Sequence, residues 1–338
     1  MSVGLDIGSK TIKMVELAKD GGKWKLRGSG IVGYSGNPIE HMQDEKELTA
    51  LSGLIKKLHK ESNVSSKEIM IALPEPQVFT RTIKFPLLTD QEVASAVKWE
   101  AEQYIPIPIN EAIIQHQILE RKENASPPEV VVLLVAAPRI LVEKYVKVAQ
   151  TAGLTVVGVE TALMSLVRSL APLDQTVLVI DFGARSTDIA IAKNGLLSFS
   201  RSVPTAGEAF TRAVAQSLGV EVKQAEEYKR TYGLSGSQLE GKVSGALGPV
   251  FRLVADEIKK AIQFYQTEEK GESPKAVVLS GGTAGLPEAI STLSKSLGIE
   301  VVVGNPFSKI VVDPDTAKKI APYAPLYAIA LGLALGGE

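Results

Sequence analysis

The sequence reads Val3-Gly4-Leu5-Asp6-Ile7-Gly8-Ser9 near its beginning and Leu178-Val179-Ile180-Asp181-Phe182-Gly183-Ala184 about half a chain later. In both stretches an apolar run ends at an aspartate, and an apolar residue, a glycine and a small residue follow. The apolar run is typical of a buried strand, and the glycine allows a tight turn after it. Alternating segments at 11–17 and 23–32, and again at 187–192 and 196–201, predict that each stretch opens a three-strand meander.

A single Asp-x-Gly at a strand end is commonly only a turn, but two copies that each open a meander indicate a duplicated site. A glycine has no Cβ, so backbone N–H groups beside it can approach a phosphate. Two such turns facing each other across a cleft would hold a triphosphate, with Asp6 and Asp181 binding Mg²⁺ through water. Further polar groups come from Ser9, Lys10, Thr11, Arg185, Ser186 and Thr187.

A third stretch, at 277–287, reads Val-Val-Leu-Ser-Gly-Gly-Thr-Ala-Gly-Leu-Pro. It predicts an apolar strand that runs into Gly281-Gly282. Paired glycines let the backbone pass flat against a bound group, which is what a base and a ribose require.

The three stretches, in this order, resemble the actin/Hsp70/sugar-kinase superfamily. Residues 6–11 match its first phosphate loop, 181–188 its second and 280–286 its adenosine loop. The resemblance implies an α/β fold, a duplicated actin-like (ribonuclease H-like) ATPase of two lobes, with ATP and Mg²⁺ bound between them. The nucleotide-binding positions that it implies are Gly8, Ser9, Lys10, Thr11, Gly183, Ala184, Arg185, Ser186, Gly281, Gly282, Thr283 and Leu286.

Other positions follow from the same resemblance. Glu226 and Lys229 match a helix that reaches the adenosine, although an exposed i, i+3 charge pair is the simpler interpretation. Gly207-Glu208 resembles the turn that approaches the ribose. Glu160 is expected to open a helix where the superfamily keeps the residue that orients the attacking water; stabilisation of the helix N-terminus is the alternative.

The segment 85–108 resembles the PilM family of type IV pilus proteins, whose extra subdomain replaces the one found in actin and Hsp70. Thr89-Asp90-Gln91-Glu92 within it predicts a capped helix start. The resemblance implies a partner, the cytoplasmic N-terminal tail of a PilN-like inner-membrane protein, bound in a groove beside this subdomain. Candidate groove residues are Phe85, Trp99, Tyr104 and Ile105. Core packing is the alternative, and it is the more common role for a Trp and a Tyr at this spacing.

Two other members of the superfamily are alternatives. A cell-division scaffold like FtsA would need a C-terminal amphipathic membrane helix, whereas this chain reads Gly336-Gly337-Glu338 directly after its predicted closing helix. A small-molecule kinase would need a catalytic aspartate in the first lobe, and no motif for one is found. The resemblance favours a nucleotide-binding scaffold that is at most a slow ATPase.

Length and composition agree with this interpretation. At 338 residues the chain is expected to form two lobes. We predict a first lobe at 1–84 and 155–175, an inserted α+β subdomain at 85–154, a second lobe at 176–206 and 271–338, and a helical subdomain at 207–270.

The net charge of −1 gives no electrostatic reason to expect nucleic acid, and the absence of cysteine excludes disulfides. The N-terminus lacks signal-peptide features, and the uncharged stretch 321–337 contains prolines and is too short to span a bilayer. A cytoplasmic protein is therefore expected, attached to the membrane only through a partner.

Overall fold

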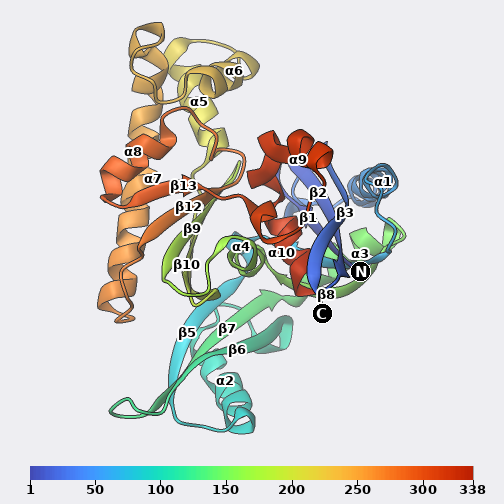
Figure 1. Ribbon diagram of the computed structural model, residues 1–338, viewed down its shortest axis with the longest axis vertical. Helices are drawn as coiled ribbons and strands as arrows, with labels where there is room; N and C mark the ends of the chain where they lie inside the picture. The colour runs from blue at the N-terminus through green and yellow to red at the C-terminus, as the bar shows by residue number, and fades with distance from the viewer. Residues whose placement is uncertain (338) are drawn as a thin grey trace.

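The computed structural model describes residues 1–337, so Glu338, at the end of the predicted C-terminal stretch, lies outside the described residues. Two five-stranded sheets flank a central pair of helices, and a three-stranded sheet with its own helix lies to one side (Figure 1). The chain is thus α/β, with each large sheet opened by one of the two repeated stretches.

The first sheet has the order β3-β2-β1-β4-β8. Its meander is antiparallel, as predicted, and β4 and β8 add to it parallel to β1. Helices α1 and α3 pack on one of its faces. The elements are β1 (Ser2–Ile7), β2 (Thr11–Asp20), β3 (Lys23–Gly33), α1 (Glu45–Glu61), β4 (Glu68–Leu73), α3 (Arg139–Thr151) and β8 (Thr155–Thr161).

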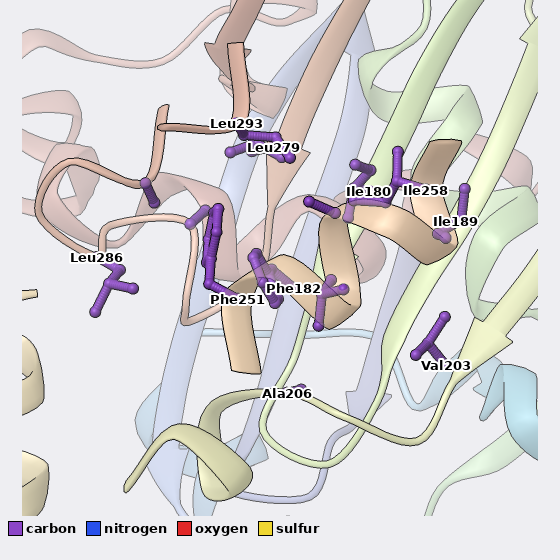
Figure 2. Packing of buried hydrophobic residues seen from close by; sticks show 14 of the residues in the cluster. Ile180, Phe182, Ile189, Val203, Ala206, Phe251, Ile258, Leu279, Leu286 and Leu293 are labelled. Carbon is purple, nitrogen blue, oxygen red and sulfur yellow. The ribbon is translucent and has the colours of Figure 1, made fainter. Parts of the chain in front are cut away.

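The second sheet repeats this topology in the order β11-β10-β9-β12-β13. Its core contains the edge-to-face rings of Phe182 and Phe210, whose centroids are 5.7 Å apart. Phe251 packs against both rings, and Figure 2 shows it beside Phe182. The elements are β9 (Val177–Phe182), β10 (Thr187–Lys193), β11 (Leu196–Val203), α5 (Gly207–Leu218), α6 (Val222–Tyr232), α7 (Lys242–Thr267), β12 (Ala276–Ser280), α8 (Ala289–Leu297) and β13 (Glu300–Val303).

Helices α4 (Ala162–Leu170) and α10 (Ala328–Gly336) lie between the two sheets (Figure 1). Their close approach depends on glycine: a Cβ on Gly4 of β1 would overlap the Ala330 carbonyl, and one on Gly332 would overlap the Ser165 carbonyl. The segment Pro314–Gly336 is long and apolar enough to cross a membrane by length and composition, with half of its apolar window buried. Burial of α10 between the sheets explains this apolar character.

The inserted subdomain has an antiparallel sheet in the order β5-β7-β6, with α2 on one face. Its strands are β5 (Phe79–Pro86), β6 (Ala112–Lys122) and β7 (Glu129–Pro138). Helix α2 (Asp90–Tyr104) begins with the predicted capping box, in which Thr89 accepts from the Glu92 N–H and the Glu92 carboxylate accepts from the Thr89 N–H. That local prediction is confirmed.

The C-terminal segment corrects one predicted boundary. We assigned residues 271–338 to the second lobe, but the part after β13 packs on the first sheet, where Phe307 and Tyr327 meet Val15 and Leu17. Because β3 is an edge strand, its free backbone groups bond Val311: Leu26 N–H donates to the Val311 carbonyl at 3.0 Å. Helix α9 (Pro314–Ile320) and a 3₁₀ segment (Ala321–Tyr327) that contains Pro322 and Pro325 then lead into α10.

Candidate nucleotide-binding site

The two predicted phosphate loops have the same backbone geometry. The Gly8 N–H donates to the Thr11 carbonyl at 3.1 Å, and the Gly183 N–H donates to the Ser186 carbonyl at 3.1 Å. A Cβ on Gly8 would lie 3.0 Å from the Thr11 oxygen, and one on Gly183 would lie 2.9 Å from the Ser186 oxygen. A larger residue would force the backbone to shift at Gly183 and would crowd it at Gly8, whatever the loops bind.

An ion pair joins the first loop to the start of α5 in the second lobe. The Lys10 Nζ of the first loop lies 2.8 Å from the Glu208 carboxylate. Arg185 and Arg212 approach the same carboxylate at 3.7 and 4.0 Å. Burial raises the pKa of Glu208, but the hydrogen bond from Lys10 and the charges of the two arginines outweigh it and hold that pKa below its usual value. The resemblance implied a ribose contact for Glu208, whereas here it faces the phosphate loops.

The backbone fixes Glu208 beside the second loop. The Glu208 N–H donates to the Ala184 carbonyl at 2.8 Å, and the Gly207 N–H donates to the Gly183 carbonyl at 3.2 Å. A Cβ on Gly207 would lie 2.9 Å from the Thr283 hydroxyl, so only glycine lets α5 start this close to the adenosine loop. The first turn of α5 thereby belongs to the same site as residues 183–186.

The two predicted metal-binding carboxylates have different surroundings. Asp6 is buried and its Oδ2 accepts from the Lys13 ammonium at 2.7 Å, a contact that follows from the direct pairing of Asp6 and Lys13 across β1 and β2. Burial and the charge of Asp188 raise the pKa of Asp181 to about 7, with Lys13 opposing and Asp6 adding to the shift. Lys13 was missed in the sequence, although its place opposite Asp6 in a hairpin was a usable signal.

The predicted adenosine loop contacts the second phosphate loop. The Thr283 hydroxyl donates to the Gly183 carbonyl at 3.0 Å, and the Thr283 N–H donates to the Phe182 carbonyl at 3.0 Å. Gly281 has φ +85°, and a Cβ there would overlap the Asp181 carboxylate. Leu286, in contrast, is buried in the core of the second lobe (Figure 2), so its side chain is a packing group.

Glu226 and Lys229 are more than an exposed charge pair. The Lys229 side chain is buried, and its Nζ donates to the Glu226 carboxylate at 2.6 Å, to the Thr211 hydroxyl at 2.9 Å and to the Gly207 carbonyl at 3.0 Å. Burial lowers the pKa of Lys229, and Glu226 opposes that shift. The lysine thus ties α6 to the first turn of α5, next to Glu208.

The prediction that Glu160 opens a helix was wrong. Glu160 is the next-to-last residue of β8, and Thr161 caps α4 instead, accepting from the Met164 N–H. The Glu160 carboxylate is held by Arg168 through two bonds of 2.6 and 2.7 Å and by the Ser165 hydroxyl at 2.9 Å. Its register partner on β4 is Ala72, one residue beyond the Leu5–Ile71 pair of β1 and β4, so Glu160 lies near the same end of the sheet as Asp6.

A second buried carboxylate near the site was missed. Glu75, between β4 and β5, is 3% exposed; its Oε1 lies 3.5 Å from the Thr80 hydroxyl, and its Oε2 has no hydrogen-bond partner. Burial raises the pKa of Glu75 to about 7, although Ser200 and the Leu163 N–H lower it somewhat. The sequence around it, Pro74-Glu75-Pro76, indicated only a turn.

The candidate partner residues divide into core and surface. Phe85 and Ile105 are each 8% exposed and lie in the core of the inserted subdomain, which corrects their assignment as groove residues. Tyr104 is half-buried under Arg81, whose guanidinium carbon lies 3.9 Å from the ring centroid. Trp99 is 71% exposed on α2, so the core alternative is wrong for this residue.

Comparison with known proteins agrees with this architecture. In the solved structure of a PilM–PilN type IV pilus biogenesis complex, one chain superimposes with a TM-score of 0.84 at 28% identity, over 99% of this chain and 97% of that one. MreB 5 of Spiroplasma citri bound to AMPPNP gives a TM-score of 0.60 at 12% identity, over 99% of this chain and 95% of that chain, which shows a shared actin-like fold.

Sequence comparison identifies the family. Cell division protein FtsA of Streptococcus pneumoniae serotype 2 is 23% identical over 343 residues, which cover 88% of this chain and 74% of the relative. The model of the type IV pilus assembly protein PilM family matches residues 4–338. The chain belongs to the type IV pilus assembly protein PilM family.

Proposed function

We propose that this protein is a cytoplasmic scaffold of the type IV pilus inner-membrane platform that binds ATP with Mg²⁺ and the N-terminal tail of a PilN-like membrane protein. The nucleotide part is supported by two candidate phosphate loops that are each closed by an equivalent backbone hydrogen bond, and by the ion pair that links Lys10 of the first loop to Glu208 of α5 beside the second. The proposal keeps the lobe and subdomain boundaries predicted from the sequence, except that the segment after β13 is assigned to the first lobe, on whose sheet it packs.

The proposed Mg²⁺ site would use Asp6 and Asp181. Among residues 1–337 no group of three or more His, Cys, Asp or Glu side chains is arranged to hold a metal ion. Mg²⁺ suits this sparse donor set, because it is usually bound by one or two carboxylates together with substrate phosphates and water. The pKa of Asp181 is raised first by burial and then by the charge of Asp188, and a dication beside Asp181 would favour its ionised form. When bound, the ion would neutralise phosphate charge.

The chain's own residues would hold the nucleotide as follows. Backbone N–H groups of the two loops, with Lys10 and Arg185, face the phosphates; Gly281 and Gly282 let the backbone approach the base and ribose. Glu226 and Lys229 are proposed on the adenosine side. Glu160 is proposed to orient water, and its two bonds from Arg168 leave it already satisfied, which agrees with slow hydrolysis at most.

The partner proposal rests on family membership and on the solved complex of a PilM with a PilN. The exposed indole of Trp99 is the aromatic candidate that a peptide could cover without unfolding the subdomain. Membrane attachment would then come through the partner, since α10, the most apolar helix, is committed to the core between the sheets.

The test is isothermal titration of the full chain, first with ATP and Mg²⁺ and then, loaded with both, with a synthetic N-terminal tail of a PilN-like protein. We expect saturable one-to-one binding of the peptide. Trp99→Ala should weaken peptide binding and leave ATP binding unchanged, while Tyr323→Ala, an exposed aromatic of the C-terminal segment, serves as the matched control.

The outcomes separate the two parts of the proposal. ATP binding without peptide binding would leave the nucleotide site and return the function to the division-scaffold or kinase alternatives. Peptide binding without ATP binding would refute only the nucleotide-binding part of the proposal. Equal effects of Trp99→Ala and Tyr323→Ala would exclude Trp99 from the partner surface.

A further inference from the structure

Glu208 stands out because it places a negative charge where the proposed function needs positive charge. Its carboxylate lies within 4.0 Å of three cations, Lys10 from the first loop, Arg185 from the second and Arg212 from α5. Among the ion pairs formed by residues 1–337, one carboxylate faces three cations here, which leaves an excess of positive charge that suits a polyanion.

We propose that Glu208 is a built-in competitor of the polyphosphate: it occupies Lys10 and Arg185, and a bound triphosphate must displace it from both. The inference rests on the proposed nucleotide binding. It also changes the role of Glu208 from the ribose contact that the superfamily resemblance implied to a regulator of phosphate affinity and of lobe closure.

The backbone supports this role because it holds the competitor in place. The bonds from Glu208 N–H to Ala184 and from Gly207 N–H to Gly183 fix the carboxylate's starting point on the second lobe. Lys10 is fixed on the other lobe, since its carbonyl accepts from the Tyr34 N–H at 2.8 Å. The ion pair is therefore a contact between lobes, and breaking it changes how the lobes are joined as well as the local charge.

The ion pair is of a kind that a ligand can break. The side chains of Lys10 and Glu208 are 55% and 29% exposed, so solvent screens their attraction. The free energy of such an exposed ion pair corresponds to a change of about two- to fivefold in the dissociation constant of a ligand that must break it. Glu208 would thus tune the affinity for the polyphosphate without preventing its binding.

The experiment compares Glu208→Gln with wild-type protein, using ATP and inorganic tripolyphosphate as separate ligands at low and high salt. Glutamine keeps the size of the side chain and removes its charge. We expect both ligands to bind about two- to fivefold more tightly, with a smaller gain at high salt, because screening weakens the competition. Glu61→Gln, which removes an exposed carboxylate paired with Lys57 far along α1, should change neither affinity.

Each outcome decides the question. Unchanged affinity for both ligands in Glu208→Gln would overturn the inference, and so would weaker ATP binding with unchanged tripolyphosphate binding, which is the signature of a ribose contact. A wild-type protein that binds no ATP would instead refute the nucleotide part of the proposed function. A melting temperature of the variant within about 1 °C of wild type confirms that the comparison is made between folded proteins.

Discussion

Glu75→Gln should remove a pH dependence of stability that the buried carboxyl imposes. Glutamine resembles the protonated acid in size and polarity but cannot ionise. The folded-state pKa of Glu75 is raised from 4.5 to about 7 by burial, so the folded protein holds a proton there that the unfolded chain has released. A raised acid pKa stabilises the fold at low pH, and that stability is lost as pH rises through 7.

The magnitude follows from the size of the shift. One pKa unit corresponds to about 1.4 kcal/mol, so between pH 5 and 8.5 the wild-type protein should lose roughly 2–3 kcal/mol that the variant keeps. Unfolding entropy of about 2.1 cal/mol/K per residue gives ~0.7 kcal/mol/K for 338 residues. The melting temperature of Glu75→Gln minus that of wild type should therefore increase by about 3–4 °C over this pH range.

The assay is thermal unfolding followed by circular dichroism from pH 5 to 8.5, with Glu61→Gln as the exposed control. Groups that do not interact with residue 75 titrate alike in both proteins, so their contributions cancel in the difference. Asp188 is the exception: the charge of Glu75 helps to raise its pKa to about 7, so its loss in the variant adds to the expected increase. A constant difference across the range, within about 1 °C, would refute the reasoning and mean that Glu75 ionises as readily as an exposed glutamate.

The remaining predictions concern buried charge, close packing and the surface. Asp6→Ala should lower the free energy of unfolding by ~3–5 kcal/mol, because both side chains of the Asp6–Lys13 pair are 9% exposed and the ammonium would lose its partner. Chemical denaturation of the double variant Asp6→Ala/Lys13→Met should show that part of this stability returns, and a double variant no more stable than Asp6→Ala would contradict the reasoning. Gly332→Ala should cost ~1–3 kcal/mol or more through overlap with Ser165, whereas Gly53→Ala, in open space on α1, should stabilise by about 1 kcal/mol in the same assay. Trp99→Ala should change the melting temperature by less than ~1 °C, since the side chain is 71% exposed; a larger loss would show that its stem supports the subdomain.

The parts of the fold that could be predicted are those with local signals. The hairpins after Asp6 and Asp181 are set by alternation and by turns, and the start of α2 by its capping box. Strand β8 was not predicted, because its extended conformation depends on hydrogen bonds to β4, which is distant in the chain. The return of the C-terminal segment to the first sheet depends on the free edge of β3, more than 280 residues earlier, which no local pattern records.

The candidate site shows the same division. Repetition in the sequence pointed to both candidate phosphate loops, and in the structure each is closed by an equivalent backbone hydrogen bond, while their binding of phosphate stays a prediction. The direction of each side chain was not predictable, because it depends on tertiary neighbours. Glu208 forms an ion pair with Lys10, and Glu160 forms one with Arg168. Glu75 escaped notice since its burial results from the meeting of β5, β11 and α4, which are distant in the chain.

The position of α10 has a consequence for synthesis. Residues of α10 pack on β1 and β2. The ribosome makes these strands first and α10 last, so the apolar face that α10 covers stays exposed until synthesis is complete. At about 5–20 residues per second, this exposure lasts roughly 15 to 70 seconds for a chain of 338 residues. During that time the nascent N-terminal meander is the segment of this protein in greatest need of a chaperone, and truncation before residue 328 should leave it permanently exposed.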